Sequence, residues 1–334
     1  MENNKPLLIC LTSTRNYGWI TSLFLKANSI WADYIIMVDQ MSTDGTRELA
    51  RSNPKVILLD NEDMTYSETK RSEMAINRAR EINGDKILIY LAIDEILSAN
   101  YCDTNDWKRI LESKPKDVFC LTWANLLPDN KHFLSVKNKS NNPFWMARIF
   151  HDDGQTPYNN EGLDMHTHCI PYPQSDVNEF YIEDFKILHF AYYSESWNKA
   201  KQRFYQFVDY DKNKRTATVL NRMYKSPMDK IMLEKLSKKW VYNYKLHSFD
   251  MFSEVDLETT SFFDNYVLEF IDKNGLKHYE KLNVWDKDFR QKYNISDPRR
   301  INYKLLHSYF NITHQFQNVI FVRLIDKLLK MLGV

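Results

Sequence analysis

The segment Lys86-Ile-Leu-Ile-Tyr-Leu-Ala-Ile-Asp-Glu-Ile-Leu97 decides the fold. Its apolar run, Ile87 to Leu91, is short and rich in Ile and Leu, which predicts a strand buried on both faces of a sheet. Two adjacent acids, Asp94 and Glu95, follow. Ligands of open α/β sheets bind beyond the carboxyl ends of such strands, so these acids indicate a divalent-metal site for a phosphorylated ligand. The alternative is a helix or turn start, where acids favour the positive dipole end.

The residues before this segment predict alternating strands and helices. We expect strands at 6–12, 34–38 and 55–59, and helices at 19–30, from a Ser42 or Thr43 N-cap through Leu49, and from a Ser67 N-cap to about Ile82. A strand–helix alternation with short links implies a parallel sheet with right-handed crossovers. The fold class predicted for this part of the chain is therefore α/β.

Composition excludes several classes of function. The 334 residues carry a net charge of +1, so nothing calls for a nucleic-acid partner. With 7 glycines there is no glycine-rich phosphate loop, and the four cysteines show no C-x-x-C spacing. We find no signal segment and no apolar run of membrane-spanning length. These features predict a soluble, cytoplasmic protein.

Two motifs resemble a known family. Val38-Asp-Gln-Met-Ser-Thr-Asp-Gly-Thr46 resembles the V-D-N-x-S-x-D-G-T signature of family 2 glycosyltransferases, which have the GT-A fold. Leu91-Ala-Ile-Asp-Glu95 is similar to the L-D-x-D-E metal motif of that family. The resemblance covers about residues 5 to 100 and continues more loosely through Arg148-Ile-Phe150 and His189-Phe190. It implies a GT-A (Rossmann-like) mixed, mainly parallel sheet flanked by helices, as in bacterial glycan-synthesis enzymes.

The resemblance also implies a nucleotide-sugar donor, with a UDP-sugar expected first, and Mn²⁺ or Mg²⁺ as cofactor. By matching positions, Asp39 would accept a hydrogen bond from the nucleotide base, and Asp94 would bind the metal. The other positions implied to contact the nucleotide are Thr12, Arg15, Lys70, Arg71 and Ile93. Structural alternatives exist: Asp39 could cap the turn after its strand, and the two basic residues could form an exposed helix face.

One position departs from the family pattern. Ala92 stands where the family usually has the first acid of its D-x-D motif. Metal binding would then depend on Glu95 or a histidine besides Asp94. His189, at the end of an expected strand, is the histidine we would assign to the metal or the diphosphate, although a buried core histidine would fit the same pattern.

The densest polar cluster is Asn159-Asn-Glu-Gly-Leu-Asp-Met-His-Thr-His-Cys169. An inverting sugar transfer needs a carboxylate that takes the proton of the acceptor hydroxyl. Glu161 and Asp164 are the candidates, with Asp164 preferred because it lies beside the histidines. The alternative is a solvated loop whose histidines cap backbone carbonyls.

The predicted organisation is a GT-A domain at 1–215, with a nucleotide-sugar half at 1–120 and an acceptor-side half at 121–215, then a mainly helical extension at 216–334. Met228 to His247 predicts a basic amphipathic helix, and Phe316 to Leu332 a second one. The last helix would dock on the body of the protein or, alternatively, lie on the inner face of the membrane near a lipid-linked acceptor.

These observations predict an inverting, metal-assisted glycosyltransferase that acts on a glycan or lipid-linked acceptor. The rival prediction is a non-catalytic nucleotide-sugar-binding or scaffold subunit of a glycan-assembly complex, which the missing acid at Ala92 would favour. A nucleotidyltransferase is a third possibility, disfavoured because its glycine-rich N-terminal loop is absent.

Overall fold

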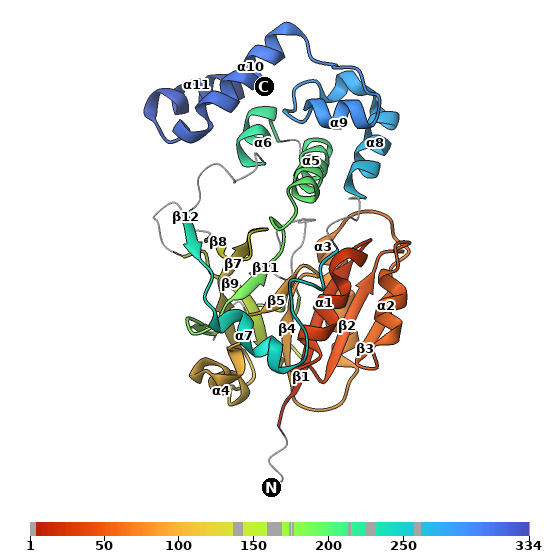
Figure 1. Cartoon of the computed structure of the whole chain (residues 1–334), viewed down its shortest axis with the longest axis vertical. Helices are drawn as coiled ribbons and strands as arrows, with labels where there is room; N and C mark the ends of the chain where they lie inside the picture. Colours follow the sequence, from red (N-terminus) through yellow and green to blue (C-terminus); the bar gives the residue numbers. More distant parts are fainter. Residues whose placement is uncertain are drawn as a thin grey trace. The chain divides into compact units, whose positions relative to one another are not determined.

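The computed structural model describes residues 5–135, 143–158, 169–173, 175, 177–212, 215–224, 232–256 and 262–333. The chain divides into two compact units (Figure 1). The first consists of Met1–Tyr193 with Met232–Thr259, and the second of Ser194–Ile231 with Thr260–Val334. Each unit is described by itself below.

A seven-stranded sheet in the order β10-β6-β9-β4-β1-β2-β3 forms the centre of the first unit. Its strands are β1 (Leu7–Thr14), β2 (Tyr34–Asp39), β3 (Val56–Asp60), β4 (Lys86–Tyr90), β6 (Asp117–Leu121), β9 (Met146–His151) and β10 (Asn178–Tyr181). All neighbours are parallel except β9, which runs antiparallel to β4 and β6. The predicted mixed, mainly parallel α/β sheet is confirmed, and β4 is buried between two other strands.

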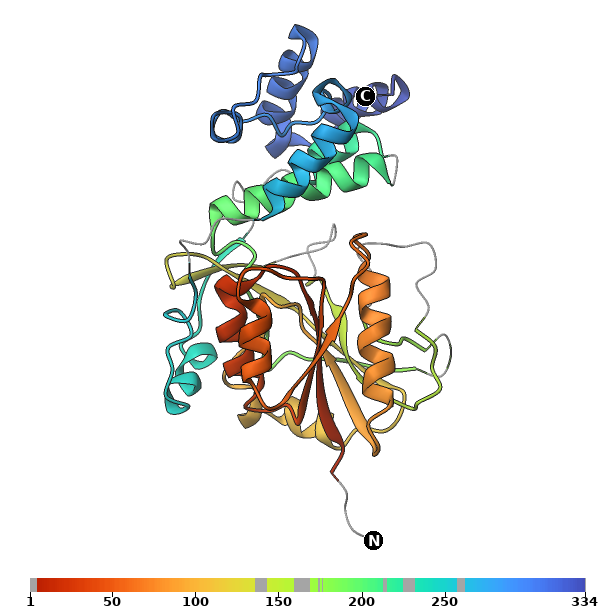
Figure 2. The ribbon, with the colours of Figure 1, turned by 90° about the vertical axis from the view of Figure 1, so that its right-hand side faces the viewer.

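Three helices cover this sheet: α1 (Gly18–Asn28), α2 (Thr46–Ser52) and α3 (Glu68–Arg80). Figure 2 shows α1 and α2 on one face and α3 on the other. Ser67 caps α3 as predicted, since its side chain accepts a hydrogen bond from the Lys70 amide. The predicted Ser42 or Thr43 cap of α2 is wrong. Gly45, with φ 91°, occupies the N-cap, because Ser42 binds the carboxylate of Asp39 instead.

A second sheet, ordered β12-β8-β7-β11-β5, lies in the same unit. Its strands are β5 (Glu95–Leu97), β7 (Trp123–Leu126), β8 (His132–Ser135), β11 (Ile187–His189) and β12 (Met232–Lys235). Strand β11 lies between β5 and β7 and pairs His189 with Glu95 on one side and with Asn125 on the other. Strand pairing therefore gathers three polar residues that are far apart in the sequence.

The helix predicted from Met228 to His247 is wrong over residues 232–235, and its first four residues lie outside the described residues. Residues 232–235 form β12, whose backbone pairs with the edge strand β8, and only α7 (Lys239–Leu246) is helical. The pairing satisfies the backbone of an otherwise open sheet edge, which local helix periodicity does not foresee. Two short elements, η1 (Tyr101–Asp103) and α4 (Asn105–Leu111), complete the described part of this unit.

In the described part of the second unit, every element of secondary structure is a helix. Its elements are α5 (Glu195–Asp211), α6 (Ala217–Met223), α8 (Phe263–Asn274), η3 (Leu276–Tyr279), α9 (Lys287–Lys292), α10 (Ile301–Thr313), η4 (His314–Phe316) and α11 (Ile320–Met331). Aromatic side chains of α5, including Phe204 and Phe207, pack against Phe263 and Tyr279. This packing places α5 in the helical unit, so the predicted domain boundary at 215 does not coincide with the division between the units. Among the described residues, no helix combines the length and apolar character needed to cross a bilayer.

Candidate functional site

Asp94 and His189 lie together at the end of β4. Asp94 follows β4 in the chain, and His189 ends β11. The Oδ2 atom of Asp94 lies 3.7 Å from the Nε2 atom of His189, and the amide of Phe190 donates a 2.9 Å hydrogen bond to the carbonyl of Asp94. The backbone thus holds the two side chains side by side, at the sheet edge where α/β proteins bind ligands.

A chain of hydrogen bonds fixes the tautomer of His189. The amide nitrogen of Asn125 donates to the carbonyl of Leu134 at 3.1 Å, which orients the amide oxygen toward the ring. That oxygen lies 2.8 Å from Nδ1 of His189, so Nδ1 carries the proton. Trp123 stacks on the ring with centroids 5.0 Å apart. Nε2 is therefore the ring nitrogen that lies beside Asp94, and it is the nitrogen that this tautomer of the imidazole would offer to a metal.

Glu95 has other partners than a metal. Its Oε1 atom accepts hydrogen bonds from the indole of Trp123 at 2.6 Å and from the guanidinium of Arg148 at 3.2 Å. Its Oε2 atom accepts from the amide of Ala92 at 2.8 Å. Burial opposes the charge on Arg148, but the Glu95 carboxylate raises the pKa of the guanidinium above its ordinary value. These contacts favour a structural role for Glu95, which was predicted as a metal ligand, and Arg148 is a partner that we did not foresee.

Among the described residues, no group of three or more His, Cys, Asp and Glu side chains is arranged to hold a metal ion. The described side chains that would hold the predicted Mn²⁺ or Mg²⁺ are the Asp94 carboxylate and the His189 imidazole. Such cations accept a small protein ligand set because waters and phosphate oxygens fill the other positions. The predicted bases Glu161 and Asp164, with the neighbouring histidines, lie outside the described residues and stay predictions.

Further polar residues lie next to one another at the carboxyl ends of β1, β2 and β3. Asp39 pairs in register with Thr14 on β1 and with Asp60 on β3. The buried Asp39 carboxylate accepts hydrogen bonds from the amide and hydroxyl of Ser42 and, at 2.8 Å, from the guanidinium of Arg47. It therefore organises the loop after β2, and its predicted contact with a base stays untested.

Arg47 is a residue of this edge that sequence reasoning missed. Its guanidinium bridges Asp39 and Asp60, with a 2.7 Å contact to the latter. Partial burial opposes its charge, but the bond to Asp39 raises the pKa of the guanidinium above its ordinary value. The available signal was its position directly after the Asp44-Gly45-Thr46 motif. A fixed arginine at this edge is suited to a phosphate or a polar base edge.

The predicted Thr12, Arg15 and Ile93 also lie near strand ends. Thr12, on β1, is fully buried, and among the described residues no partner lies within hydrogen-bonding distance of its hydroxyl. Arg15 follows the end of β1 and is half-buried, whereas Ile93 is buried next to Asp94. The structure groups these residues at one edge of the sheet and leaves their nucleotide contacts as predictions.

Lys70 and Arg71, in the first turn of α3, differ in their surroundings. Lys70 is exposed and forms a 2.8 Å ion pair with Asp63, which lowers the pKa of that carboxyl to about 2. Arg71 is buried, lies 4.6 Å above the ring of Tyr66 and donates from Nε to the carbonyl of Ser67 at 3.3 Å. Lys70 thus matches the exposed-face alternative, whereas Arg71 does not.

The Asp44-Gly45-Thr46 motif joins two helix starts. One carboxylate oxygen of Asp44 accepts from the amide of Gly18 at 2.7 Å, and the other accepts from the hydroxyl of Thr46 at 2.6 Å. A Cβ atom on Gly18 would come within 2.7 Å of the Asp44 carbonyl oxygen. The motif therefore holds α1 against the start of α2, a structural task that explains its residues without a ligand.

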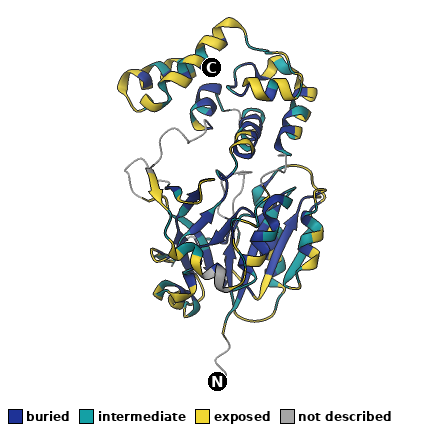
Figure 3. Cartoon of the chain, in the orientation of Figure 1, coloured by how far each residue is buried: buried dark blue, intermediate teal, exposed yellow. Residues whose placement is uncertain are grey.

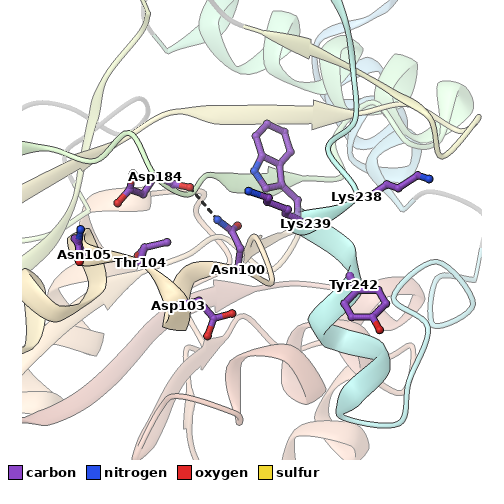
Figure 4. A pocket seen from close by; sticks show the side chains of 9 residues that line it. Asn100, Asp103, Thr104, Asn105, Asp184, Lys238, Lys239 and Tyr242 are labelled. Carbon is purple, nitrogen blue, oxygen red and sulfur yellow. Dashed lines mark hydrogen bonds between the residues drawn. The ribbon is translucent and has the colours of Figure 1, made fainter.

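A pocket of about 650 Å³ opens elsewhere in the first unit, beside η1, α4 and α7 (Figure 4). Its lining includes Asp103, Asp184, Lys238 and Lys239. The amide of Asn100 donates to the carbonyl of Asp184 at 2.9 Å across it. Neither Asp94 nor His189 lines this pocket, so we base the candidate site on the convergent polar groups at the sheet edge and not on pocket size.

Comparison with known proteins gives matches of low identity and low TM-score. No family model and no curated protein matches the sequence. Among solved structures, HddC from Yersinia pseudotuberculosis matches at 10% identity and TM-score 0.33, over 59% of this chain and 98% of that one. The inositol-1-phosphate CTP transferase from T. maritima matches at 10% identity and TM-score 0.32, over 55% and 89%. A mycobacterial protein matches at 15% identity and TM-score 0.26. The match covers 37% of this chain, and this chain spans 42% of the length of the mycobacterial protein. At these values the activity of the chain must be argued from its own residues.

Proposed function

We propose that this chain is an inverting, metal-assisted glycosyltransferase that moves a sugar from a nucleotide-diphosphate-sugar to a hydroxyl of a glycan or lipid-linked acceptor. The observation that carries the proposal is the pairing of Asp94 with His189, whose Nδ1 is bonded to Asn125 so that Nε2 lies beside Asp94. The resemblance of the two sequence motifs to family 2 glycosyltransferases supports it.

The site residues have distinct tasks in this proposal. A bound Mn²⁺ or Mg²⁺ would offset the negative charge that develops on the departing diphosphate. Asp94 and His189 would hold it at the sheet edge. Glu95 keeps the Ala92 turn and the Arg148 guanidinium in place, and so fixes the position of Asp94. Because these groups are ordered by the fold, they need little rearrangement when the donor binds.

The nucleotide would lie along the carboxyl ends of β1 and β2. Asp39 and Arg47, joined by a 2.8 Å ion pair, are the charged groups suited to its base or ribose. Asp164 or Glu161 would take the proton of the acceptor hydroxyl as it attacks the sugar from the side opposite the diphosphate. We expect Asp39→Ala to raise the donor KM mainly.

The test is release of nucleoside diphosphate from a panel of nucleotide-sugars with Mn²⁺, comparing the parent protein with Asp94→Asn and His189→Gln. We expect both variants to lose at least a hundredfold in turnover, and Glu73→Gln, an exposed acid on α3, to match the parent. Turnover that survives in Asp94→Asn would remove the metal-holding role.

One observation favours the rival function, a nucleotide-sugar-binding subunit without catalysis. Ala92 supplies no acid, and both Glu95 oxygens are occupied by protein donors, which leaves two described side chains to hold a metal. In that case the parent protein would bind a nucleotide, with or without Mn²⁺, but release no diphosphate in the presence of any acceptor.

A further inference from the structure

The last two helices expose many large apolar side chains. Figure 3 shows most of α11 and much of α10 coloured as exposed. We call these residues the apolar surface. Its members are between 48% and 77% exposed: Ile301, Leu305, Ile312, Phe316, Val319, Ile320, Phe321, Leu324, Leu328, Met331 and Leu332. Large exposed apolar areas are unusual on a monomer and mark interaction sites.

The exposed apolar residues follow helix periodicity. Ile301, Leu305 and Ile312 lie on one side of α10. Ile320, Leu324 and Leu328 lie on one side of α11. Residues four apart share a helix face, so each helix presents a continuous apolar stripe to solvent. The residues of these stripes lie within helices and not in loops.

A buried ion pair sets the orientation of α11. Asp326 is one of two buried residues of this helix, and it receives hydrogen bonds from Arg222 on α6 at 2.8 and 2.9 Å. The hydroxyl of Tyr309 donates to the same carboxylate at 3.0 Å. The helix therefore attaches to its unit through this polar contact and the buried Val322, and its apolar stripe faces outward. The expected docking of the apolar face is therefore not seen within the unit that contains the helix.

Positive charge borders the apolar stripe of α11. Arg323, Lys327 and Lys330 are exposed, and among the described residues none of the three has an ion-pair partner. From residue 298 to the C-terminus the sequence holds six Lys and Arg residues but one acid, the buried Asp326. An apolar face with cations along its border matches an anionic lipid interface, where long basic side chains reach the headgroups while the stripe enters the acyl boundary.

We propose that α10 and α11 bind the protein to the surface of an anionic lipid bilayer. A second copy of the chain is the less suitable occupant, because pairing two such surfaces would bring Arg323, Lys327 and Lys330 against the same cations of the other copy. The helices lie in the interface and do not cross it. This inference does not rest on the proposed function, although a lipid-bound protein would meet a lipid-linked acceptor at the membrane.

The test is cosedimentation of the full chain with vesicles. We expect binding to phosphatidylcholine vesicles that contain phosphatidylglycerol, weaker binding to pure phosphatidylcholine, and release as salt is raised. Phe321→Ser with Leu324→Ser should weaken binding roughly tenfold for each side chain withdrawn from the interface. Lys327→Gln with Lys330→Gln should weaken binding to the anionic vesicles alone.

The matched control is Leu233→Ser, which removes a leucine of similar exposure, 59%, on β12 in the first unit and should bind as the parent does. Light scattering without lipid tests the competing occupant, a second copy of the chain, because it measures whether the protein is a monomer or a dimer. Failure to bind anionic vesicles, or binding that the double serine variant does not weaken, would overturn the proposal. So would a stable dimer that the same variant dissociates. Nucleotide binding by the serine variant should be unchanged, which separates this test from that of the proposed function.

Discussion

Replacing Glu95 with glutamine tests whether this acid supports the site or binds the metal. The glutamine side chain has nearly the same shape but leaves the Arg148 guanidinium, which is 11% exposed, without its carboxylate. Removing one partner of a buried ion pair costs about 3–5 kcal/mol. A neutral amide also accepts fewer hydrogen bonds than the carboxylate, which receives three here. We therefore expect Glu95→Gln to lower the free energy of unfolding by about 4 kcal/mol.

The assay is urea unfolding followed by tryptophan fluorescence, with Arg148→Met and the double variant measured beside Glu95→Gln. Because the two charges compensate each other, the double variant should be at least about 2 kcal/mol more stable than the sum of the single losses predicts. Glu73→Gln, an exposed acid on α3, should change stability by less than about 0.5 kcal/mol. A Glu95→Gln variant that unfolds like the parent but binds Mn²⁺ weakly would refute our reasoning and restore Glu95 as a ligand.

Three further changes test other parts of the structure. Asn125→Leu should weaken Mn²⁺ binding 10- to 100-fold in calorimetry, because the His189 tautomer is no longer fixed. Gly18→Ala should lower the melting temperature, because its Cβ would meet the Asp44 carbonyl oxygen at 2.7 Å; an unchanged melting temperature would contradict this packing. Burial lowers the pKa of His307 to about 4 from 6.5, so the native state binds fewer protons than the unfolded state and loses about 3 kcal/mol as the pH falls between these values. His307→Gln should lose less over that pH range, as measured by urea unfolding.

Local patterns were sufficient to predict the parallel half of the fold. The strands that became β1 to β4 and the Ser67 cap of α3 depend on neighbours in the sequence, so apolar runs and capping residues revealed them. The helix expected over 228–247 failed because β12 pairs with a strand about a hundred residues earlier. Pairing across the chain is invisible to a periodicity argument.

Sequence reasoning named candidate residues for the site but could not give the contacts between them. Asp94 and His189 were both predicted as site residues. The side-chain amide that bonds to Nδ1 of His189 belongs to Asn125, which lies 64 residues away in the sequence. The contacts of Glu95 were not foreseen because its partners Trp123 and Arg148 lie 28 and 53 residues further on, and its predicted role as a metal ligand stays untested. A carboxylate that binds a metal and a carboxylate that neutralises a buried arginine look alike in sequence.

The central claim is that Asp94 and His189 hold a metal for a nucleotide diphosphate, and a thermal-shift panel tests it most directly. UDP, GDP, CDP and dTDP are added to the parent protein and to Asp94→Asn, each with and without Mn²⁺. We expect one nucleotide to raise the melting temperature of the parent in the presence of Mn²⁺ only, and to have no effect on the variant. Equal stabilisation with and without Mn²⁺, or a response that Asp94→Asn retains, would contradict the account.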